Sequence, residues 1–129
     1  MANYFKEEGD TPGWDGRIHM QSVPNKLNWL ELSRPLPCGD SYIPANFRWN
    51  GASSGLFEKL IILNFPKWKH PIASCRHDWR CLKARTKKER AIADKLFYND
   101  IGEGGTKWEQ IKGYIGVRIG AFFGVAVRY

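Results

Sequence analysis

A run of five small residues, Gly51-Ala52-Ser53-Ser54-Gly55, divides the chain into two parts with different patterns. Before the run, the segments 17–23, 27–33 and 41–49 are short and rich in β-forming residues. After it, the spacing of apolar residues and the capping signals are those of helices. The sequence therefore predicts an α+β fold, with a small N-terminal antiparallel sheet followed by a bundle of three to four helices. The turns that separate the β-prone segments are Pro24-Asn25, Pro35-Leu36-Pro37 and Gly39-Asp40.

Three helix starts can be placed from capping signals. Pro71 suits the first turn of a helix that we expect over 71–84. The capping box formed by Thr86 and Glu89 opens a second helix, which should end near residue 99 before the glycines at 102–105. A second capping box, at 106–109, opens a last helix that should continue nearly to the C-terminus. In that helix glycines at 116, 120 and 124 predict a groove for packing against the chain's own helices.

The length of 129 residues is near the usual size of one domain, and 43% hydrophobic residues exclude a disordered chain. We expect a single domain over 1–129, with a β-rich part at 1–50 and a helical part at 56–129. Three cysteines, together with a polar N-terminus that does not look like a signal peptide, favour free thiols in a reducing compartment. No apolar run reaches membrane-spanning length, so the expected protein is soluble or peripheral.

The net charge of +7 is concentrated in one stretch of the chain. Residues 67–95 hold 10 basic and 3 acidic residues, whereas the rest of the chain is nearly balanced. Such a field attracts polyanions, either nucleic-acid phosphates or anionic lipid head groups, although a merely solvated face remains an alternative. The candidate polyanion-binding residues are Arg76, Arg80, Lys83, Arg85, Lys87, Lys88 and Arg90.

The strongest candidate for chemistry is the pair His77-Asp78 in the first helix, together with Asp94 in the second. Three and four residues are near neighbours on a helix, so His77 shares a face with Ala73 and Cys81. A short turn should make the two helices antiparallel neighbours, and Asp94 could then meet His77 across the seam. A histidine held by a buried carboxylate is the usual arrangement for a general base.

Structural interpretations compete with this one. Asp94 could simply pair with Arg90 four residues earlier, and His77 could be a core histidine bonded to the backbone. Other chemistries have weaker support: no CxxC or HxxxH spacing indicates tetrahedral zinc, and no P-loop, GxSxG or dinucleotide motif occurs. Cys81 lies one turn from His77, but nothing in the sequence marks its thiolate as stabilised.

Three motifs in order resemble a small phage-associated family of unknown function. They are YIPANFRWNGAS at 42–53, His77-Asp78, and Ala93-Asp94 followed by Phe97, against a family pattern of roughly VPxGFxTDGASxP, HDxLY and ADxxF. The resemblance covers about residues 27–125. The HD and AD motifs are in turn similar to those of phospholipase A2, particularly the short form found in parvovirus capsid proteins.

The resemblance implies a role for each matching residue. His77 would be the general base, Asp94 the carboxylate that orients it, and Asp78 a calcium ligand, with Asn50 and Gly51 in the turn that completes the metal site. Calcium would polarise the ester carbonyl. Asn50 stands where the family has aspartate, which removes one charge from the cation site, and Cys81 replaces the tyrosine of HDxLY.

Three functions follow as expectations. The first is a phage-encoded, calcium-dependent lipid esterase that acts at an anionic lipid surface. The second is a non-catalytic virion or accessory protein, whose basic helix pair contacts nucleic acid, the capsid, other virion proteins or a host partner. The third is a nucleic-acid-binding module, although no recognised motif accompanies the basic stretch. The expected location is the virion or the host cytoplasm, and the sequence predicts no oligomeric state.

Overall fold

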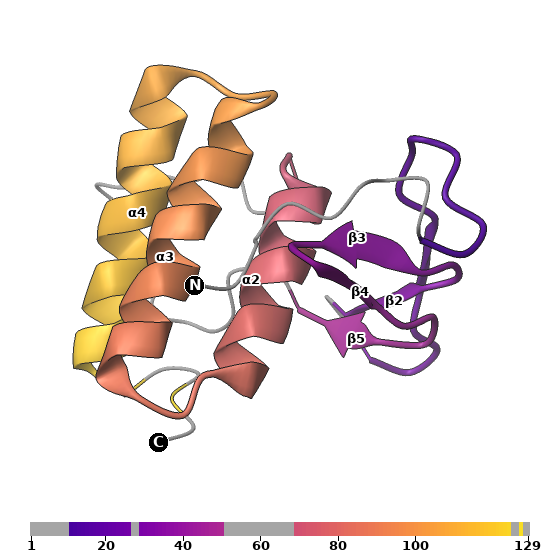
Figure 1. Cartoon of the computed structure of the whole chain (residues 1–129), viewed down its shortest axis with the longest axis horizontal. Coiled ribbons are helices and arrows are strands. Elements are labelled where there is room, and N and C mark those ends of the chain that lie inside the picture. Colours follow the sequence, from indigo (N-terminus) through magenta and orange to yellow (C-terminus); the bar gives the residue numbers. More distant parts are fainter. Residues whose placement is uncertain (1–10, 27–28, 51–68, 125–126, 128–129) are drawn as a thin grey trace. The chain divides into compact units, whose positions relative to one another are not determined.

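The computed structural model describes residues 11–26, 29–50, 69–124 and residue 127. The fold is α+β, with small N-terminal antiparallel sheets followed by three packed helices, as the sequence predicted (Figure 1). The chain divides into two compact units, Met1–Asn50 and Gly51–Tyr129. The boundary falls where the sequence changes from strand to helix signals, and the assignment of both parts to one domain stays a prediction.

The described residues of the N-terminal unit form two antiparallel sheets rather than one. Strands β1 (Met20–Ser22), β2 (Leu30–Leu32) and β5 (Arg48–Trp49) form a three-stranded sheet in the order β1-β2-β5. Strands β3 (Leu36–Cys38) and β4 (Ser41–Ile43) form a hairpin. The largest fully buried side chains of this unit are those of Leu32, Leu36, Ile43 and Trp49.

Two strand predictions need correction. The triplet Pro35-Leu36-Pro37 is not simply a turn, because Leu36 and Pro37 belong to β3. Proline is tolerated there because β3 pairs on one side only, with β4, among the described residues. The segment 41–49 is not one strand either. Asn46 interrupts it with a φ of 75°, and its N–H donates to the Leu32 carbonyl over 2.8 Å.

The helical unit contains α2 (Pro71–Lys83), α3 (Lys87–Gly102) and α4 (Lys107–Phe122). Helix α3 lies between the other two, and α2 and α3 run antiparallel (Figure 1). All three helices start where the sequence predicted, but α3 continues three residues beyond the expected end at 99. Their shared apolar core consists of Ala73, Phe97, Ile101 and Val117.

The glycines of α4 have two different roles. Gly116 and Gly120 are buried in the helix, together with Gly113, and α4 packs closely against α3. Gly124 instead follows the helix with a φ of +79°, a left-handed conformation that suits the residue after a helix end. The predicted four-residue repeat therefore combines a packing face with a helix stop.

The start of α4 is fixed by a complete capping box. The Thr106 hydroxyl accepts the Glu109 N–H, and the Glu109 carboxylate accepts the Thr106 N–H over 3.0 Å. Lys69 also donates to Glu109, with 2.8 Å between Nζ and Oε2. The Lys69 hydrogen bond and the Thr106 N–H lower the pKa of Glu109 to about 2. This carboxylate therefore joins Lys69, two residues before α2, to the first turn of α4.

Gly105 has no space for a side chain, which gives a testable contrast with its neighbour. A Cβ at Gly105 would lie 2.6 Å from His70 Cε1 and 2.8 Å from the Ile101 carbonyl oxygen. A Cβ at Gly104 would meet nothing within 4 Å. We expect Gly105→Ala to lower the free energy of unfolding by about 1–3 kcal/mol, as overpacking does, and Gly104→Ala to change it by less than about 0.5 kcal/mol. Urea denaturation of both variants checks this, and equal effects would contradict it.

Candidate functional site

His77 and Asp94 meet across the α2–α3 seam, as the sequence predicted. His77 Nε2 lies 2.7 Å from Asp94 Oδ1. His77 lies in a buried row of α2 with Ala73 and Cys81, and its ring packs against Phe97 with 4.8 Å between centroids. The pair is strongly buried, since His77 is 6% exposed and Asp94 is 0% exposed.

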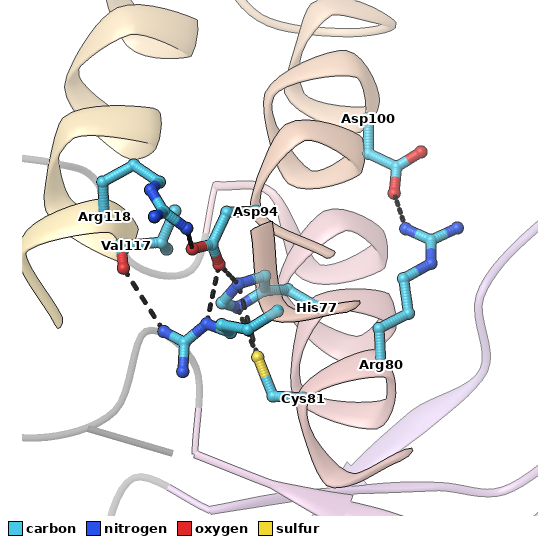
Figure 2. A network of polar contacts seen from close by, with 8 residues as sticks. His77, Arg80, Cys81, Asp94, Asp100, Val117 and Arg118 are labelled. Carbon is cyan, nitrogen blue, oxygen red and sulfur yellow. Dashed lines mark hydrogen bonds and ion pairs between the residues drawn. The ribbon is translucent and has the colours of Figure 1, made fainter. Parts of the chain in front are cut away.

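Asp94 also accepts hydrogen bonds from two arginines. Arg90 Nε lies 2.9 Å from Asp94 Oδ1, and Arg118 Nη1 lies 2.8 Å from Asp94 Oδ2. Arg90 Nη2 donates in addition to the Val117 carbonyl of α4 over 3.3 Å. Figure 2 shows the Asp94 carboxylate between His77 on one side and Arg118 on the other. One carboxylate thus joins all three helices.

The electrostatic surroundings give the two partners different charge states. Burial lowers the pKa of His77 and outweighs the opposing effect of Asp94, so the imidazole is neutral near pH 7. Burial alone would raise the pKa of Asp94, but the hydrogen bonds from His77 and Arg90 outweigh it and hold the pKa below 3.8. The site therefore contains an ionised carboxylate and a neutral histidine. This is the charge distribution that a general base requires.

Cys81 lies beside the histidine. Its Sγ is 3.5 Å from His77 Nε2 and 3.9 Å from Nδ1. In a nucleophilic triad the thiol and the carboxylate face opposite ring nitrogens, whereas here the nearer nitrogen for both is Nε2. A triad with Cys81 as nucleophile is therefore not formed in this arrangement.

The ligand atoms of His77, Cys81 and Asp94 lie within 4.8 Å of one another, a group that could hold a metal ion. No CxxC or HxxxH spacing indicates this group, because one of its ligands comes from a second helix. The available signal was the spacing of His77 and Cys81, four residues apart on one helix face. A cation there would have to compete with the guanidinium groups of Arg90 and Arg118 for the same carboxylate.

The three residues predicted to bind calcium lie in different parts of the chain. Asp78 is half-buried on α2, whereas Asn50 is the last residue of the N-terminal unit. Gly51 lies outside the described residues. Among the described residues Asp78 is thus the one carboxylate of the predicted site, while calcium takes six to eight oxygen ligands. The calcium site therefore stays a prediction.

The predicted polyanion-binding residues divide into a group that is buried or half-buried and a group that is exposed. Arg90 is only 2% exposed and points into the helical unit. Arg76 and Arg80 are half-buried and both donate to Asp100 of α3, over 3.3 and 2.9 Å. Figure 2 shows the Arg80–Asp100 contact beside the His77 network. The exposed members, which remain available to a polyanion, are Lys83, Arg85, Lys87 and Lys88.

Arg118 belongs to the site although no motif in the sequence indicated it. This residue lies 24 positions beyond Asp94 and on a different helix, so no local spacing connects the two. Its position in the glycine-bearing part of α4 was the available signal, because small residues allow α4 to approach α3 closely. The Arg90–Asp94 pair was anticipated, but as an alternative to the His77 contact. In the structure Asp94 makes both contacts through one oxygen.

The lowered pKa of His77 predicts a pH dependence of stability. Because the folded pKa lies below 6.5, the unfolded chain binds a proton at this residue at a higher pH than the folded chain. The contribution to stability is complete above about pH 6.5 and decreases as the pH falls toward the folded pKa. Asp94 titrates below 3.8, outside this range. We expect His77→Gln to flatten the decline in unfolding free energy between about pH 7.5 and 5, measured by urea denaturation; an unchanged slope would contradict this.

No family model, curated protein or solved structure matches this chain. The motif resemblance described above therefore stays an expectation. None of the helices in the described part of the chain combines the length and apolar character needed to cross a membrane.

Proposed function

We propose that this chain is a phage-encoded ester hydrolase of the phospholipase A2 type, with His77 as the general base and Asp94 as the residue that orients it. The observation that carries the proposal is the 2.7 Å contact between His77 Nε2 and a fully buried, ionised carboxylate. The placement of the two motifs also supports the proposal, because His77 comes from one helix and Asp94 from its antiparallel neighbour.

The contact with Asp94 determines which nitrogen reacts. A neutral imidazole whose Nε2–H donates to Asp94 keeps its lone pair on Nδ1. Nδ1 would take a proton from a water molecule as the water oxygen attacks the ester carbonyl. The imidazolium formed in this step is stabilised by Asp94 and returns the proton to the leaving alkoxide, giving a free acid and an alcohol.

The arginines on Asp94 would serve this mechanism by holding the carboxylate. Arg90 and Arg118 occupy one oxygen each, and Asp94 remains ionised while His77 changes its charge. In this scheme they are positioning residues, because they act through Asp94. Any contribution of calcium through Asp78, Asn50 and Gly51 is an additional proposal, which assays with and without the metal would test.

The test is hydrolysis of phospholipid in mixed micelles, with and without millimolar calcium. We expect activity from the native chain and a loss of about 10²–10⁴-fold in His77→Gln, the usual contribution of a general base. His19→Gln is a matched control, because His19 also contacts an aspartate, Asp15, over 2.9 Å, but in the N-terminal unit. A native chain with no activity under either condition, or full activity in His77→Gln, would refute the proposal.

A second candidate is a non-catalytic virion or accessory protein, and the burial of the network favours it. His77 and Asp94 are almost inaccessible to solvent, as expected when a polar cluster fixes the packing of helices. The exposed residues Lys83, Arg85, Lys87 and Lys88 would then contact nucleic acid, the capsid or a host protein. This alternative predicts nucleic-acid or virion-protein binding that weakens at high salt, and a His77→Gln chain that loses stability without any turnover to lose.

A further inference from the structure

The outer side of α4 carries a row of exposed apolar side chains. The buried residues on its inner side are Glu109, Gly113, Gly116, Val117 and Gly120. Trp108, Ile115 and Phe122 are 61%, 39% and 84% exposed. Their spacing of seven residues is nearly two helical turns, which places them on one face.

This row is too long to be an isolated exposed apolar residue. Trp108 and Phe122 are fourteen positions apart, or about 21 Å along the helix axis. Phe123, which follows directly, is 67% exposed and packs edge to face against Phe122. Isolated apolar residues at a surface are normal, whereas a continuous apolar strip marks a surface with a partner.

The charges along α4 indicate the chemistry of that partner. Lys112 flanks the row on one side, with its Nζ 5.7 Å from the centre of the Trp108 ring. Lys107 flanks it on the other side, as the 100° step between residues places it, together with Arg118, which donates to Asp94 and has a side chain that is 41% exposed. The one acidic residue of α4, Glu109, is buried and bound to Lys69. The strip therefore carries cations on both sides and no exposed carboxylate.

We propose that the outer face of α4 docks on the surface of an anionic lipid bilayer. A helix with aromatic and aliphatic residues on one face and flanking lysine or arginine lies in the head-group region of such a membrane. Trp108 supplies the amphipathic ring that prefers this depth, and the flanking cations meet the anionic head groups. A second copy of the chain fits less well, because pairing α4 with itself would bring cationic flanks together without acidic partners.

The proposal does not depend on the hydrolase function, since docking requires neither His77 nor an ester bond. Vesicles of ether-linked phosphatidylcholine, with or without ether-linked phosphatidylserine, separate the two because they contain no ester to hydrolyse. The full chain is incubated with these vesicles, and the bound fraction is measured by flotation. We expect binding to the serine-containing vesicles that decreases when salt is raised, and much weaker binding to phosphatidylcholine alone.

The matched variants are Trp108→Ser with Phe122→Ser, and separately Leu82→Ser. The double substitution should weaken binding at least about tenfold, because two large apolar side chains no longer enter the interface. Leu82 is a similar exposed apolar residue, 40% exposed, but on α2, so its substitution should change binding by less than about twofold. Lys112→Glu provides a second test that leaves the apolar row intact, and it should reduce the preference for phosphatidylserine.

Three outcomes would overturn the proposal. In the first, the native chain does not float with serine-containing vesicles. In the second, the Trp108/Phe122 variant and Lys112→Glu both bind like the native chain. In the third outcome, sedimentation would show a native dimer that the Trp108/Phe122 variant converts to a monomer, with no vesicle binding by either. That result would assign the face to a second copy instead.

Discussion

Replacing Asp94 with alanine should lower the free energy of unfolding by about 3–5 kcal/mol, the usual cost of removing one partner from a buried ion pair. The carboxylate is 0% exposed and accepts hydrogen bonds from His77, Arg90 and Arg118. Without it, the guanidinium of Arg90 stays inside the helical unit, where its side chain is 3% exposed, and it has lost the carboxylate to which it donates. A buried charge that loses its counter-ion is expensive because little water reaches it.

Asp100→Ala provides the matched control for this loss. Asp100 also accepts hydrogen bonds from two arginines, Arg76 and Arg80, but its side chain is 12% exposed and theirs are 15% and 14% exposed. Partial access to water lets those arginines be solvated when the carboxylate is gone, so we expect a smaller cost, about 1–2 kcal/mol. Urea denaturation at neutral pH measures both variants. Equal losses in the two variants would mean that burial does not determine the free-energy cost of removing the carboxylate.

Much of the helical unit follows from local sequence signals. Pro71, Thr86 and Thr106 each act on backbone groups within one turn, so their effect does not depend on distant residues. The His77–Asp94 contact could also be predicted, because the three-residue connection between α2 and α3 leaves the helices antiparallel. Once both faces were known, the helical period was enough to bring the two side chains together.

The missed features depend on contacts between distant segments. Arg118 reaches Asp94 because α4 approaches α3 along its buried glycines, and the glycine spacing indicates close packing without showing which residue of α3 lies opposite Arg118. The sequence predicts a turn at Pro37 because proline disfavours sheets, but among the described residues its strand β3 pairs with β4 alone, and a strand paired on one side tolerates proline. Arg90 was counted with the basic surface residues, since a charge run does not reveal which member turns inward. In each case tertiary contacts decided the outcome.

Arg90 and Arg118 allow the contribution of burial to be separated from that of charge. They donate to the same carboxylate over 2.9 and 2.8 Å, but their side chains are 3% and 41% exposed. We expect Arg90→Met to lower the free energy of unfolding by about 3 kcal/mol, at the low end for a buried pair because Arg118 still compensates Asp94. Arg118→Met should cost about 1 kcal/mol or less, as partly exposed ion pairs do. Urea denaturation of each variant checks these values.

The double variant Arg90→Met/Arg118→Met then tests whether the two arginines act together. After either single substitution, Asp94 keeps one guanidinium and its charge remains compensated. After both, the partner that Asp94 keeps in the described part of the chain is the neutral His77, so the loss should exceed the sum of the single losses by at least about 1 kcal/mol. Additive losses would mean that each arginine stabilises the fold through its own packing, as Arg90 does in part through the Val117 carbonyl. A loss above the sum would mean that both arginines stabilise the fold by compensating the charge of Asp94. That charge would then be the common link between the three helices.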